Sequence, residues 1–116
     1  MRLLLISIIL TLATFDVLAE APELSCDIGS VEKTFGGSSW LVHGCNDGHS
    51  VVVVSAPASP ATPFYFLFTF NDGSYQLAGE GTGAKAATDA AYAELSELEA
   101  ADIADLYVET ARAESE

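Results

Sequence analysis

At 116 residues, the chain is long enough to build one folded core. It carries only 4 Lys and Arg residues against 17 Asp and Glu residues, which gives a net charge of −13 at pH 7. This balance argues against nucleic-acid binding, which needs clustered basic side chains, and against docking on anionic lipid headgroups. The acidity is explained either by solubility in a saline environment or by attraction to a basic partner protein.

The first 19 residues have the pattern of a secretory signal peptide. A short positive n-region precedes an apolar run of about a dozen residues, which Asp16 interrupts. This run is shorter than the roughly twenty apolar residues that cross a bilayer core. We expect cleavage after Ala19, or alternatively after Ala21, leaving residues 20–116 as a single periplasmic or secreted domain. An uncleaved membrane anchor is the competing interpretation, and after cleavage no stable anchor is expected.

Two cysteines, Cys26 and Cys45, remain in the expected mature domain. In an oxidising compartment, a pair this close in sequence favours a disulfide. A disulfide closing a loop of this size stabilises a protein by about 3 kcal/mol in the chain-entropy model. This is a large share of the ~5–10 kcal/mol expected for a small domain. Because Arg2 and Asp16 would leave together, cleavage keeps the net charge at −13.

The first half of the mature domain predicts β structure. The expected order is a strand within residues 26–34, a turn at 35–38, a strand at 40–42, a turn at 46–48, a strand at 51–54 and a proline-rich loop at 56–63. Asn46-Asp47-Gly48 lies between two β-rich runs and predicts a three-residue hairpin loop.

Residues 64–70 give the most informative strand pattern. Phenylalanine occupies every second position, so four phenylalanines share one face of the strand. We expect a central strand whose phenylalanine face packs on the main core. A second Asn-Asp-Gly turn at 71–73 leads into a strand at 74–78. The result is a small antiparallel sheet of four to five strands within residues 26–78.

Residues 84–112 lack Gly and Pro, are rich in Ala, Glu and Leu, and repeat apolar residues at helical spacing. They predict either one helix or two helices with a break near 97–101. Strands followed by helices indicate an α+β fold, with the C-terminal helices packed on the phenylalanine face. The carboxylates at helical spacing are expected to form a solvated face: Glu94, Glu97, Glu99, Asp102 and Asp105.

The glycine-rich residues 79–83 precede the helical region, which is the context of phosphate-binding loops. However, Ala86 follows Lys85 where a P-loop has Ser or Thr. We therefore expect a strand-to-helix connection and no nucleotide cofactor.

The residues around the 46–48 turn suggest a second candidate site. With a three-residue loop, Cys45 would face His49, and His43 would share the face of Cys45. These groups could hold zinc or copper, but the expected disulfide would remove the thiolates and leave two surface histidines. We therefore assign no metal ligands.

The aromatic residues outside the phenylalanine strand, Trp40, Tyr75 and Tyr92, are expected in the core. If the second face of the sheet is uncovered, Trp40, Tyr65 and Leu67 would form an exposed apolar patch. Such a patch is typical of a partner or dimer interface.

The sequence contains no recognisable catalytic constellation. It has no Gly-x-Ser-x-Gly motif, and Ser50 beside His49 does not by itself give triad geometry. We expect a non-catalytic exported binding domain without a cofactor, whose partner is a basic protein or a second copy of the chain. The alternative is a metal-binding or small hydrolytic protein that uses His43 and His49.

Overall fold

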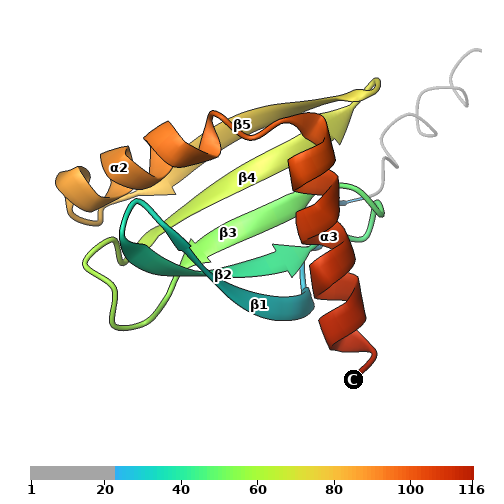
Figure 1. Cartoon of the computed structure of the whole chain (residues 1–116), viewed down its shortest axis with the longest axis horizontal. Helices are drawn as coiled ribbons and strands as arrows, with labels where there is room; N and C mark the ends of the chain where they lie inside the picture. Colours follow the sequence, from blue (N-terminus) through green and yellow to red (C-terminus); the bar gives the residue numbers. More distant parts are fainter. Residues whose placement is uncertain (1–22) are drawn as a thin grey trace, which may run out of the picture.

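The computed structural model describes residues 23–116, so the expected signal peptide lies outside the described residues. Five strands form one antiparallel sheet in chain order, and two helices follow them (Figure 1). The elements are β1 (Ile28–Phe35), β2 (Ser38–Gly44), β3 (Val51–Ser55), β4 (Phe64–Asn71), β5 (Ser74–Gly81), α2 (Lys85–Leu95) and α3 (Ala100–Glu114). The prediction of an α+β fold with C-terminal helices is confirmed.

Two of the hairpins turn through two residues each. In the β1–β2 turn, Gly36 and Gly37 have φ of 60° and 82°, and in the β4–β5 turn, Asp72 and Gly73 have φ of 52° and 83°. Paired positive φ angles match the twist of antiparallel strands and favour Gly or Asp at these positions. Both turns lie where the sequence predicts them.

The β2–β3 hairpin differs from the prediction. The backbone N–H of Cys45 donates to the carbonyl oxygen of Ser50 at 2.9 Å, so Cys45 lies opposite Ser50. The expected three-residue loop, with Cys45 facing His49, is therefore wrong by one residue. The cause is Asp47, whose carboxylate accepts the N–H groups of both His49 and Ser50 and extends the loop before pairing resumes.

The core lies between the helices and one face of the sheet. Phe66 and Phe68 are 2% and 3% exposed, which confirms that the phenylalanine face packs on the helices. The other large core side chains are Trp40, Val42, Val51, Val53, Leu95, Ile103 and Leu106. Trp40 is fully buried on this side, with its ring 5.3 Å from that of Phe66. The expectation that Trp40 is a core residue is therefore confirmed, and the alternative that it joins Tyr65 and Leu67 in an exposed patch is wrong.

The helical region divides into two helices because the chain turns between Leu95 and Ala100. The carboxylate of Asp102 accepts the backbone N–H of Glu99 at 2.9 Å, which stabilises the start of α3. Tyr92 of α2 is 50% exposed, so the expectation that it is a core residue is wrong. Neither helix within residues 23–116 has the length and apolar character required to span a bilayer.

Candidate functional site

The face of the sheet that points away from α2 and α3 is the main candidate surface (Figure 1). Side chains alternate between the two faces of a strand, so the strand register defines which residues share this face. Two cross-strand rows result, Glu32–Leu41–Val54–Tyr65–Glu80 and His43–Val52–Leu67–Ala78. We define the open-face patch as the six apolar members of these rows, Leu41, Val52, Val54, Tyr65, Leu67 and Ala78.

The open-face patch is accessible to a partner. Tyr65 is 41% exposed and Ala78 is also exposed. The other four side chains of the patch are half-buried by their neighbours. A contiguous apolar surface of this kind marks interaction sites more often than scattered apolar residues do. The prediction that Tyr65 and Leu67 share a surface is confirmed, although Trp40 does not belong to it.

Carboxylates border the patch at both ends of one row. Glu32 on β1 and Glu80 on β5 are exposed and lie on opposite edges of the sheet. The Tyr65 hydroxyl donates to the Glu80 carboxylate at 3.0 Å. This hydrogen bond, together with the negative charge of Glu80, raises the pKa of Tyr65 above its usual value. The two rows contain no Lys or Arg, so the patch has a negatively charged border.

A shallow depression adjoins the patch at the Tyr65 end. It has a volume of about 490 Å³. Its principal lining residues are Val54, Pro63, Phe64, Tyr65, Glu80 and Thr82. The depression is large enough to receive an apolar side chain of a partner, with the Glu80 carboxylate beside it.

The two candidate histidines are not brought together. His43 lies on the open face opposite Val52, and its Nδ1 atom is buried without a hydrogen-bond partner. The His49 ring stacks on Phe70, 4.3 Å away, and Phe70 shares the phenylalanine face of β4. Within residues 23–116 no group of three or more His, Cys, Asp or Glu side chains is arranged to hold a metal ion.

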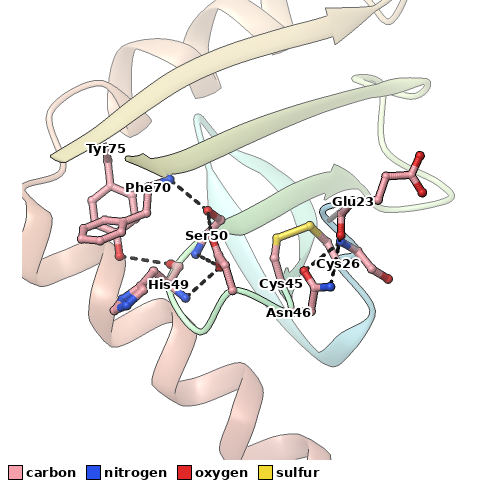
Figure 2. The surroundings of a disulfide bond; sticks show 10 residues. Glu23, Cys26, Cys45, Asn46, His49, Ser50, Phe70 and Tyr75 are labelled. Atoms are coloured by element: carbon pink, nitrogen blue, oxygen red, sulfur yellow. Dashed lines mark hydrogen bonds between the residues drawn. A yellow bond between two sulfur atoms is a disulfide. The ribbon is translucent and has the colours of Figure 1, made fainter. Parts of the chain in front are cut away.

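The disulfide between Cys26 and Cys45 is formed, as the sequence predicts (Figure 2). Asn46 strengthens the same connection, because its side chain accepts the N–H of Ser25 at 3.0 Å and donates to the carbonyl oxygen of Glu23 at 3.2 Å. The segment before β1 is thus attached to the end of β2. A disulfide of this kind is consistent with an oxidising extracytoplasmic compartment.

The Ser50 hydroxyl is hydrogen-bonded to Asp47 and Phe70 and not to a histidine. This hydroxyl donates to the Asp47 carboxylate at 2.6 Å. The same hydroxyl accepts the backbone N–H of Phe70 at 2.9 Å (Figure 2). Burial raises the pKa of Asp47, but the hydrogen bonds from Ser50 and His49 outweigh this effect and lower the pKa below its usual value. The Asp-x-x-Ser spacing was the available sequence signal for this network, and sequence reasoning missed it.

The backbone N–H groups of the connection before α2 donate hydrogen bonds within the protein. Thr82 and Gly83 both donate to the carbonyl oxygen of Pro63, and Ala84 donates to that of Pro60. These donors fasten the connection to the 56–63 loop. Residues 79–81 belong to β5, so the strand runs three residues further than expected and the strand-to-helix connection is limited to residues 82–84.

Comparison with known proteins found no match to a family model, a curated protein or a solved structure. Function is therefore inferred from the surface of this chain itself.

Proposed function

We propose that the protein is a periplasmic or secreted, non-catalytic interaction domain that binds a basic protein through the open-face patch. The observation that carries this proposal is the pair of cross-strand rows, in which six apolar side chains adjoin one another and carboxylates border them. The disulfide supports an oxidising compartment, and the N-terminal sequence pattern supports export.

The apolar rows provide the attractive centre of the interface. Full burial of a Val or Leu side chain contributes about 1.5–3 kcal/mol, and the half-buried side chains of the patch would each contribute part of that amount. A partner must also offset the loss of rotational and translational freedom on binding. Several adjoining apolar side chains therefore favour binding more than an isolated one would.

The charge distribution supports a basic partner. Lys or Arg residues around an apolar centre would meet Glu32 and Glu80 at the borders of the patch. The net charge of −13 would also attract a basic protein over longer distances. We expect association to slow as the salt concentration rises, because salt screens exposed charges.

The test compares three immobilised proteins in a pull-down from the extracytoplasmic fraction of native cells. The first is the wild type, and the second carries Leu41→Ser and Leu67→Ser in the open-face patch. The third carries Val108→Ser, which changes an exposed apolar side chain on α3 and serves as the control. Circular dichroism and thermal unfolding verify that all three proteins are folded.

We expect the wild type and the Val108→Ser control to retain the same basic protein in stoichiometric amount. The double variant should retain at least about tenfold less, which corresponds to about 1.4 kcal/mol. Equal retention of the partner by the double variant would show that the open-face patch is not the binding site. Bound metal in protein purified without chelator, with no protein partner, would instead favour a metal-binding role.

A further inference from the structure

The outer edge of β5 is a second surface, distinct from the open-face patch. β5 runs over eight residues, from Ser74 to Gly81, and pairs with β4 without interruption. It is the last strand of the sheet, and no strand within residues 23–116 pairs with its outer edge. Proteins commonly protect such an edge with Pro, Lys or a bulge. β5 has no Pro, Lys or Arg, and its only charged residue is Glu80.

The register identifies which backbone groups point outward. In an antiparallel hairpin closed by two turn residues, the pair flanking the turn is hydrogen-bonded, and pairs then alternate. Asn71 and Ser74 flank the Asp72–Gly73 turn. The residues of β5 whose backbone groups bond to β4 are therefore Ser74 and every second residue after it, namely Gln76, Ala78 and Glu80. The N–H and C=O groups of Tyr75, Leu77 and Gly79 consequently point to the free edge.

A pocket of about 390 Å³ lies beside this edge, between β5 and the two helices. Its principal apolar and aromatic lining residues are Phe68, Tyr75, Leu77, Tyr92, Leu95 and Leu98. Tyr75 and Leu77 thus provide both outward backbone groups and part of the pocket wall. A strand added along β5 would direct every second side chain toward the helix side, where this pocket is located.

The charges near the edge favour a cationic segment over a second copy of this acidic chain. Asp72 precedes β5 and Glu80 lies near its end, while the exposed Glu97 lies in the turn between α2 and α3. Neither β5 nor the pocket lining contains Lys or Arg. Two copies would each bring a net charge of −13 to the contact.

From these observations we infer that the β5 edge accepts an extended segment of another protein as a sixth strand. The segment places one large apolar side chain in the pocket between β5 and the helices, and Lys or Arg residues flank it. Backbone hydrogen bonds to Tyr75, Leu77 and Gly79 hold the added strand, as in other cases of β-augmentation. This inference does not depend on the open-face patch.

The test uses the folded wild-type protein and the peptide acetyl-Lys-Val-Thr-Phe-Thr-Val-Lys-amide, followed by NMR titration of the protein amide signals. Two N-methylated isomers provide the matched controls: one is methylated on its second and fourth residues, the other on its third and fifth. Successive N–H groups of a strand point to opposite sides, so only one isomer turns its methyl groups toward β5. A fourth peptide replaces both Lys residues by Glu.

We expect the parent peptide to shift the amide signals of Tyr75, Leu77 and Gly79. One N-methylated isomer should bind like the parent, and the other should bind about tenfold more weakly, because two hydrogen bonds are lost. The Glu peptide should bind several-fold more weakly at low salt. Tyr92→Ala, at the pocket rim, should weaken binding of the parent peptide, whereas Val108→Ala should leave it unchanged.

Three results would each overturn strand addition by a cationic segment: no binding of the parent peptide, equal binding of the two isomers, or dimers of the free protein formed through β5. Shifts confined to Val54, Tyr65 and Leu67 would also overturn it, but they would support binding at the open-face patch. The two proposals can therefore fail separately.

Discussion

The fully buried hydroxyl of Ser50 accepts a hydrogen bond from the backbone N–H of Phe70, 20 residues further along the chain. Because the same hydroxyl donates to Asp47, it joins the β2–β3 loop to β4. The loop also carries His49, whose ring stacks on Phe70 and whose carbonyl oxygen accepts the Tyr75 hydroxyl. One buried serine thus connects a surface loop to the β4–β5 hairpin, whose second strand forms one edge of the sheet.

Replacing Asp47 by Asn should destabilise the protein at neutral pH by about 1–2 kcal/mol, because a neutral amide oxygen accepts the hydrogen bonds from Ser50 and His49 more weakly than the carboxylate does. The folded-state pKa of Asp47 lies below its usual value. Its contribution to stability is therefore complete above the unfolded-state pKa near 4 and is lost as the pH falls through the folded-state pKa. Urea unfolding at several pH values measures this difference.

The gap between wild type and Asp47→Asn should narrow in acid, where the wild-type carboxyl is itself protonated. Ser50→Ala is the matched variant, because it leaves the Phe70 N–H without this acceptor at every pH. The part of its destabilisation that comes from the unsatisfied Phe70 N–H, about 1–3 kcal/mol, should persist in acid. A gap for Asp47→Asn that stays constant with pH would contradict the assigned role of the carboxylate.

Removing the disulfide with Cys26→Ser and Cys45→Ser should lower the free energy of unfolding by about 3 kcal/mol, since the unfolded chain regains the freedom of the closed loop. Thermal and urea unfolding measure the loss. The reduced wild type is the control and should match the variant closely. Two freely reactive thiols in protein isolated under oxidising conditions would contradict the bridge.

Local patterns predicted most of the fold. The alternating phenylalanines of residues 64–70 correctly predicted the core face of β4, because side-chain alternation along a strand does not depend on the neighbouring strands. The Gly36–Gly37 and Asp72–Gly73 turns were also predictable, because their residue types suit positive φ angles.

The β2–β3 loop shows what the local patterns could not provide. The side-chain hydrogen bonds of Asp47 lengthen this loop by one residue. A register shift of one residue changes which residues of the two strands lie opposite each other on the same face of the sheet. The predicted pairing of Cys45 with His49 depended on that register. The pocket beside β5 depended on the packing of α2 and α3, which sequence spacing does not specify.

Gly44 permits the close approach of α3 to β2, so Gly44→Ala should destabilise the protein by about 1–3 kcal/mol. A Cβ atom at this position would lie 2.5 Å from Thr110 Oγ1 and 2.9 Å from a ring carbon of Tyr107. Thr110→Ala removes the nearer obstacle. In a double-mutant cycle the two substitutions should therefore be less destabilising together than the sum of their separate effects. Simple additivity would contradict the steric explanation.

Glu80→Gln should lower the pKa of Tyr65, because the hydrogen bond to a charged carboxylate and its electrostatic effect both favour the protonated phenol. The pKa should move back toward about 10, the value of an unperturbed tyrosine. Ultraviolet absorbance titration in alkali follows this change, and subtraction of the Tyr65→Phe curve separates Tyr65 from the other tyrosines. Stability at neutral pH should change by less than about 0.5 kcal/mol, because both side chains are exposed. An unchanged Tyr65 pKa would show that Glu80 does not engage the open face in solution, and a basic partner would then lack one of its two expected carboxylate contacts.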